Sequence, residues 1–210
     1  MNQLLVDGED MDVIIEGMRF TLQRDYDLAQ LRRLSLEGRI EWLRRRVNYV
    51  VLTPLRLMMP AKLGELLWSK DCNGVMLLVT LIALSIEALS QFAFPGLQGD
   101  RFNKFCMRFL FSSQLKNRSD RLAWLWQKVR NGLVHNLAIL EGGIELRRGH
   151  RYCFRRTQHG VEMDPTVFLD RFDMGCKRFF ANLAKHPRSA MRITFAETFE
   201  RRLILGDHHP

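Results

Sequence analysis

The segment SDRLAWLWQKVRNGLVHNL, residues 119–137, has the most regular helical pattern in the chain. Its apolar residues recur at the i, i+3, i+4, i+7 and i+11 spacing of one helix face, namely Leu122, Leu125, Trp126, Val129 and Leu133. A helix with one apolar face buries that face against other elements. The segment therefore predicts a packed helical domain.

Helical patterns also precede this segment, at residues 25–34, 36–52, 60–68 and 101–111. We expect Thr53-Pro54 to break the second of these helices, because proline disfavours helical backbone in the residue before it. A long apolar helix is predicted from residue 74. Its uncharged run from Gly74 to Ile86 is closed by Glu87 and is too short to span a bilayer. It is typical of a buried central helix in a soluble protein.

After residue 140 the pattern changes to that of short strands. Alternation around Ile144 and Leu146, and again around Tyr152 and Phe154, predicts a β-hairpin joined at residues 148–150, with a third strand near Val161 left open. Asp164-Pro165 then predicts the start of a last long helix. Its apolar face is formed by Phe168, Phe172, Cys176, Phe179 and Leu183.

The predicted fold is thus mainly α, a helical bundle with a small β-hairpin inserted before the last long helix. Residues 1–70 are expected to form an N-terminal helical region that packs on the bundle. Residues 71–185 form the main helical domain, with the hairpin near 142–162. Residues 186–210 show weaker periodicity and predict a C-terminal tail that is at best partly ordered.

The charge composition indicates which class of partner to expect. The 210 residues include 32 Lys and Arg against 23 Asp and Glu, a formal net charge of +9, which favours an anionic partner, with nucleic acid first. The four cysteines are widely separated and predict buried thiols in a reducing compartment; they are Cys72, Cys106, Cys153 and Cys176. With no evident signal peptide, a cytoplasmic protein that does not enter a membrane is expected.

Common catalytic motifs are missing from the sequence. It has no P-loop, no nucleophile elbow, no paired metal ligands and no dinucleotide fingerprint. Neither a metal nor a cofactor is therefore expected.

The polar residues of VRNGLVHNL, residues 129–137, form a candidate site. Asn131 and His135 are four residues apart and share a helix face, whereas Arg130 lies on the shoulder of the apolar face. An ideal helix separates Arg130 and His135 by about 140°. They converge only if Gly132 loosens the turn or if a second subunit completes the site.

This motif resembles that of the HEPN superfamily, the higher eukaryotes and prokaryotes nucleotide-binding helical domains. Members carry an arginine, commonly followed by Asn, Asp or His, and a histidine a few residues later; here Arg130, Asn131 and His135 match. The order of an apolar helix, a second helix, the motif helix, a hairpin and a final helix is also similar to a subset of bacterial relatives. The resemblance covers roughly Cys72 to Leu183.

The resemblance implies a metal-independent endoribonuclease in which the ribose 2′-OH attacks the adjacent phosphate. His135 would move protons, and Arg130 would stabilise charge on the phosphoryl oxygens. Asn131 would orient His135 or the phosphate by hydrogen bonding. It also implies RNA as substrate, a homodimer with a composite site, and an antitoxin or defence-system protein as a further partner. The RNA-binding residues expected near the site are Lys128, Arg147, Arg148 and Arg151.

Other interpretations stay open. The alternative is a catalytically silent helical module that binds nucleic acid, nucleotide or a protein partner; the intact motif favours the nuclease only slightly, since such residues can also bind without cutting. Glu87 requires a partner inside the fold, for which Arg108 or Arg130 would serve, and a structural ion pair is favoured over a catalytic acid. The stretch WLRRRVNY, residues 42–49, is either a solvated helix face or a surface on which Trp42 and Tyr49 stack with RNA.

Overall fold

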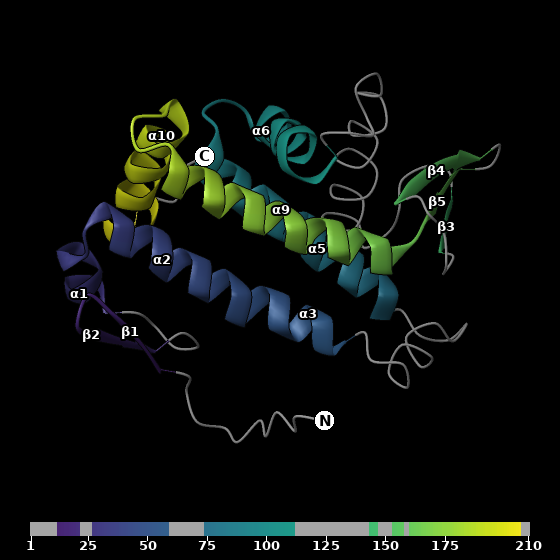
Figure 1. Ribbon diagram of the computed structural model, residues 1–210. Helices are drawn as coiled ribbons and strands as arrows, with labels where there is room; N and C mark the ends of the chain where they lie inside the picture. Colours follow the sequence, from purple (N-terminus) through teal and green to yellow (C-terminus); the bar gives the residue numbers. More distant parts are fainter. Residues whose placement is uncertain are drawn as a thin grey trace.

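The computed structural model describes residues 12–21, 27–58, 74–111, 143–146, 153–157 and 160–206 (Figure 1). Most of these residues are helical, which confirms the predicted mainly α class. Two short β-structures accompany the helices.

Three long elements form the centre of the molecule. Helix α9 (Pro165–Lys185) lies between α5 (Gly74–Ala93) and a rod made of α2 (Leu36–Arg46), the π-helix η1 (Val47–Leu52) and α3 (Thr53–Leu57). Helix α6 (Gln98–Phe105) and the π-helix η2 (Cys106–Leu110) return from α5 and cover α9 from another side. Phenylalanine rings join these layers, with Phe105, Phe109 and Phe179 within 5.6 Å of one another between ring centroids.

Helix α5 has the buried core face that its apolar sequence predicts. Leu78, Val79, Ile82, Ala83 and Ile86 are fully buried. Within the described ranges no helix is by itself both long and apolar enough to cross a membrane, and only a pair bent by 96° passes the same test together.

Helix α9 begins where the sequence predicted. The Asp164 side chain accepts hydrogen bonds from the backbone N–H groups of Thr166, at 2.9 Å, and Val167, at 3.3 Å, and Pro165 occupies the first turn. Its predicted apolar face is buried throughout.

The prediction that Thr53-Pro54 breaks the helix is wrong. The rod continues, because the chain widens into η1 before the proline. The Thr53 N–H donates to the Asn48 carbonyl five residues earlier, and the Thr53 hydroxyl donates to the same oxygen at 3.0 Å. A π-turn does not require the N–H donor that proline lacks, and it leaves space for the proline ring.

The N-terminal region was expected to be helical, but it also contains a β-hairpin. Strands β1 (Asp12–Ile15) and β2 (Met18–Thr21) form an antiparallel hairpin ahead of the short helix α1 (Leu28–Arg33). The two-residue turn, Glu16-Gly17, has positive φ at both positions, which matches the twist of a tight hairpin. Glu-Gly is a weaker turn signal than Asn-Gly or Asp-Gly, which is why this hairpin is absent from the sequence-based prediction.

The strands near the end of the bundle pair differently from the prediction. The hairpin joins β4 (Phe154–Thr157) to β5 (Gly160–Met163), and β3 (Gly143–Leu146) pairs with β5 in parallel. The expected pairing of residues around 144–146 with those around 152–154 is therefore wrong. Strand β5 lies between β3 and β4, and it uses the segment near Val161 that was left open.

The segment after His186 is far more ordered than the expected tail. It forms α10 (Ala190–Phe199) and the π-helix η4 (Glu200–Ile204), and Phe195 and Phe199 are fully buried. The helical period is hard to read because polar Arg192 and Thr198 lie on the buried side and Ile193 is exposed.

Candidate functional site

The motif residues of the candidate nuclease site lie outside the described part of the chain. Lys128, Arg130, Asn131 and His135 fall within residues 112–142, and Arg147, Arg148 and Arg151 within 147–152. The arrangement of these seven residues is therefore not described. Cys72 and the helix expected at 60–68 also lie outside the described residues.

The described residues that flank the motif segment meet at one end of the bundle. Buried Phe111, the last described residue before the segment, packs edge-on against Phe154 of β4, with ring centroids 5.8 Å apart. Strand β3, which starts directly after the segment, belongs to the same sheet as β4. The chain thus leaves the described core and returns to it at the small sheet, beside the start of α9 (Figure 1).

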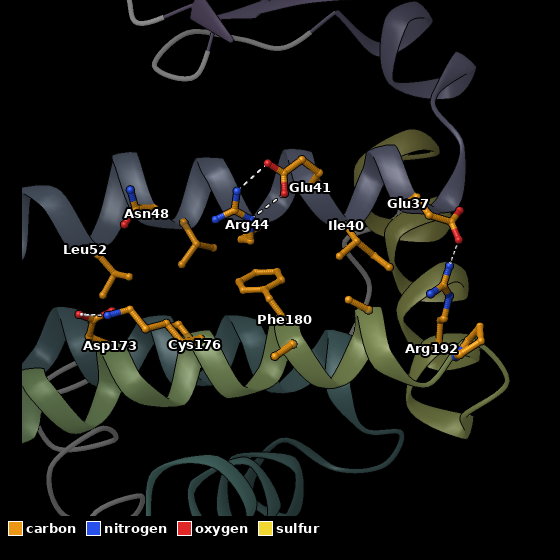
Figure 2. Close-up of a pocket in the computed structure, with 15 residues that line it drawn as sticks. Glu37, Ile40, Glu41, Arg44, Asn48, Leu52, Asp173, Cys176, Phe180 and Arg192 are labelled. Carbon is orange, nitrogen blue, oxygen red and sulfur yellow. Dashed lines mark hydrogen bonds and ion pairs between the residues drawn. The ribbon is translucent and has the colours of Figure 1, made fainter. Parts of the chain in front are cut away.

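A groove of about 720 Å³ lies between α2–η1 and α9 (Figure 2). The two helices run antiparallel, and the Phe180 ring points into the space between them. The rest of the apolar lining consists of Ile40, Val47, Leu52, Cys176, Ala181, Ala184 and Pro187. The alanines leave room on the α9 side because their side chains end at Cβ.

The start of α2 is fixed by the N-terminal hairpin. Ser35 caps the helix by accepting a hydrogen bond from the Gly38 N–H at 3.1 Å, and its own N–H donates to Glu16 at 3.0 Å. The Ser35 hydroxyl also donates to Glu16, and these bonds lower the pKa of the Glu16 carboxyl. Gly38 is required for this approach, because a Cβ there would lie 2.8 Å from the Glu16 carboxylate.

Each carboxylate that lines the groove is held by a cation. Glu41 accepts hydrogen bonds of 2.6 Å from Arg44 and from Arg45. Asp173 pairs through Oδ2 with Arg56 at 2.7 Å and with Lys177 at 3.2 Å. At the other end, Glu37 pairs with Arg192, and this contact is one of those drawn as dashed lines in Figure 2.

These contacts shift the acidity of Glu41. The hydrogen bonds from Arg44 lower the pKa of Glu41 to about 2, helped by Arg45 and opposed by partial burial. The same pairing raises the pKa of Arg44. Glu41 is therefore ionised at neutral pH and is a poor proton acceptor.

The one thiol in the groove lining is also poorly suited to chemistry. Cys176 is 2% exposed, and burial raises the pKa of its thiol, so the thiolate needed for nucleophilic attack is disfavoured. The described residues that line the groove include no histidine. The arrangement favours binding rather than acid–base or nucleophilic catalysis.

One acceptor in the groove lining has no hydrogen-bond donor among the described residues. Asp173 Oδ1 is buried and accepts no hydrogen bond from them, while Oδ2 holds both cations.

The proposed stacking surface at residues 42–49 does not form as a whole. Trp42 is fully buried and packs edge-on against Phe199, 5.8 Å away between centroids, so it cannot stack with RNA. The Arg46 guanidinium covers the Trp42 ring, and Arg44 and Arg45 are engaged by Glu41. Of the two interpretations, the solvated helix face describes these arginines better.

The sequence did not reveal the groove, since its two sides are more than a hundred residues apart. Arg192 was assigned to the tail, yet it is 5% exposed and donates to the Leu183 carbonyl at 3.0 Å. The only signal for it was an arginine three and seven residues before Phe195 and Phe199, the buried phenylalanines of α10. Without the fold, a buried arginine at this spacing cannot be distinguished from an arginine on the surface.

No group of three or more His, Cys, Asp or Glu side chains in the described ranges is placed to hold a metal ion. A scan against protein-family models and searches of curated proteins and of solved structures found no match to the chain.

Proposed function

We propose that the chain is a HEPN-like, metal-independent endoribonuclease that cleaves RNA through attack of a ribose 2′-OH on the adjacent phosphate. The observation that carries this proposal is the motif Arg130-Asn131 with His135 four residues further on, in an amphipathic segment that follows an apolar helix. Helix α5, buried through its centre, is that apolar helix.

Each motif residue has a role that its chemistry permits. Histidine is the side chain whose ordinary pKa lies near neutrality, so His135 would take the proton of the 2′-OH or deliver one to the leaving oxygen. Arg130 offers a planar fork of donors to the phosphoryl oxygens. Asn131 stays neutral and orients its neighbours by hydrogen bonding. Lys128, Arg147, Arg148 and Arg151 would hold the RNA backbone, in keeping with a net charge of +9.

A homodimer with a composite site is part of the proposal, since it would bring an arginine and a histidine that are about 140° apart on one helix to a common phosphate. The described residues offer an apolar surface for it. Leu77, Leu81 and Leu84, spaced i, i+4 and i+7 on α5, are 53%, 37% and 36% exposed.

Cytoplasmic location and a toxin or phage-defence role complete the proposal. Cys106, Cys153 and Cys176 are free and buried, which fits a reducing compartment. Within such a system, an antitoxin or another defence-system protein would be the partner that restrains cleavage.

Substitution of the motif residues tests the nuclease. His135→Ala and Arg130→Ala should each reduce RNA cleavage on the order of a hundredfold or more, because each removes a group that acts in the transition state. Wild-type cleavage should persist in chelator and leave a 2′,3′-cyclic phosphate. The measurement is gel analysis of labelled RNA with identification of the product ends.

His186→Ala is the matched control, since His186 is an exposed histidine at the end of α9. It should cleave at the wild-type rate. Circular dichroism shows whether each variant is folded. A folded His135→Ala protein with wild-type cleavage would contradict the nuclease proposal.

A second candidate function is a catalytically silent binding module, and the groove between α2 and α9 favours it. The groove has an apolar floor and paired charges at its rim, and among the described residues that line it none is an available catalytic base. This is the composition of a site that binds without reacting. It becomes the leading function if the motif variants retain full activity or if the wild type does not cleave RNA.

A further inference from the structure

Three basic side chains lie close to Phe109, near the end of the π-helix η2. The guanidinium carbon of Arg108 is 5.7 Å from the centroid of the Phe109 ring. Arg178 of α9 donates from Nη1 to the Phe109 carbonyl at 2.9 Å. Lys104 precedes Arg108 by four residues on the continuous rod of α6 and η2, so their side chains leave the rod on one side. Two distant parts of the chain thus bring three cations to one surface.

These three cations, Lys104, Arg108 and Arg178, are exposed and form no ion pair with an acid in the described ranges. The acid of α9 nearest to Arg178 among those with printed partners, Asp173, is held by Arg56 and Lys177. On α6, exposed Asp100 is the one acid, against two cations of the patch. An exposed group of like charges attracts anions. The arginines of the groove differ, because Glu41 engages both Arg44 and Arg45.

The packing of α9 on η2 fixes where these cations lie. Gly175, three residues before Arg178, approaches Leu110 at the end of η2 so closely that an added Cβ would lie 2.6 Å from Leu110 Cδ1. Arg178 is further held by its hydrogen bond to the Phe109 carbonyl, which uses one of its five N–H groups. A cation that is already positioned loses less conformational entropy when it binds a ligand.

The patch adjoins the part of the chain that carries the motif. Helix η2 ends at Leu110, and Phe111 is the last described residue before the segment that contains Arg130, Asn131 and His135. Arg108 is therefore three residues from the start of that segment. A polyanion held on the patch would lie where the chain enters it.

We propose that Lys104, Arg108 and Arg178 form a surface that binds the phosphate backbone of an RNA strand. The choice of RNA rests on the proposed function, because an endoribonuclease needs phosphate contacts outside its reacting groups. Lysine and arginine on an exposed surface bind backbone phosphates without reading the bases. The arginine fork can also donate two parallel hydrogen bonds to one phosphate.

RNA binding by the full chain tests this surface. The probe is a short fluorescent RNA whose 2′-hydroxyls are methylated, so that it cannot be cleaved and anisotropy measures binding alone. The double variant Lys104→Gln with Arg108→Gln should raise Kd about tenfold at ~0.1 M salt. It should also flatten the slope of log K against log salt by about one, the effect of roughly one to two lost phosphate contacts.

The matched control is the double variant Arg33→Gln with Arg188→Gln. It removes the same total charge from two exposed arginines, one in α1 and one in the turn before α10. Its Kd should stay within about twofold of the wild type.

Arg178→Gln tests the contribution of α9 and should raise Kd about threefold. Since Arg178 also donates to the Phe109 carbonyl, urea denaturation checks that this variant is folded. The double variant on α6 and η2 carries the test if Arg178→Gln does not fold, because neither Lys104 nor Arg108 donates a hydrogen bond to a described residue.

The outcomes separate this surface from the nuclease. If the variant of Lys104 and Arg108 binds RNA as tightly as the control does, the surface is overturned, whether or not the wild type cleaves RNA. If that variant loses affinity for inorganic polyphosphate but keeps its affinity for RNA, RNA is overturned as the ligand. A folded His135→Ala protein that cleaves normally would remove the nuclease proposal and leave the binding result standing.

Discussion

Gly175 is the residue at which α9 comes closest to η2. A Cβ added there would lie 2.6 Å from Leu110 Cδ1 and 3.1 Å from Leu110 Cγ, and Leu110 is 1% exposed. Because Leu110 has little room to move in a packed core, we expect Gly175→Ala to lower the free energy of unfolding by about 1–3 kcal/mol, despite the better helix propensity of alanine. Urea denaturation measures this change.

Gly38 is the matched glycine for that comparison. Its added Cβ would meet only the end of the Glu16 side chain, at 2.8 Å, and this carboxylate can swing into solvent. The gain in helix propensity then offsets the loss of the Glu16 contact with Ser35, so Gly38→Ala should change stability by less than about 1 kcal/mol. Equal losses in the two variants would show that the Leu110 contact is not the cause.

Glu41, in the groove lining, should make the stability of the protein depend on pH. Its pKa falls from an ordinary 4.5 to about 2 in the folded protein, so its contribution to stability is fully present above about pH 4.5 and is lost as the pH falls toward 2. Since the three side chains are largely solvated, that contribution is about 1 kcal/mol or less. The stability difference between the wild type and Glu41→Gln should therefore shrink between pH 6 and pH 3.5. A difference that is constant with pH would contradict the pairing.

At the scale of elements, helix α10 decides whether the C-terminal segment is part of the fold. Phe195 is fully buried and packs against Phe92 and Phe199, with centroids 5.7 Å away in both cases. Phe195→Ala should lower the free energy of unfolding by about 3–5 kcal/mol. Ile193→Ala on the same helix removes a side chain that is 56% exposed and should cost less than about 1 kcal/mol. Thermal and urea denaturation measure both variants. If Phe195→Ala and Ile193→Ala lowered the free energy of unfolding equally, α10 would not be packed against the core.

At the scale of the whole molecule, the exposed leucines of α5 are the surface through which the homodimer is proposed to form. The proposed homodimer predicts that Leu81→Arg with Leu84→Arg yields a monomer, because four charges in all would face each other across a two-fold axis. Light scattering over a range of concentrations measures this. Leu97→Arg is the control, since Leu97 is 78% exposed in the loop before α6 and should leave the mass unchanged. A wild-type protein that is monomeric at high concentration would contradict the dimer and, with it, the composite site.

The sequence by itself determined the features that depend on neighbours along the chain. The start of α9 follows from Asp164 and Pro165, and its buried face follows from aromatic residues at helical spacing, such as Phe168 and Phe172. The apolar α5 is equally legible, because a helix without charges over three turns has to be buried. The motif that carries the proposed function is also a local pattern.

Only the tertiary structure decided which distant segments meet. Strand β3 pairs with β5 and not with its neighbour β4, because alternation shows which face of a strand is buried but not which strand lies beside it. Arg192 is buried because Glu37 and the end of α9 supply partners from elsewhere in the chain. The groove likewise joins segments more than a hundred residues apart. Such contacts depend on the packing of complete elements, and packing leaves no periodic signal in the sequence of either partner.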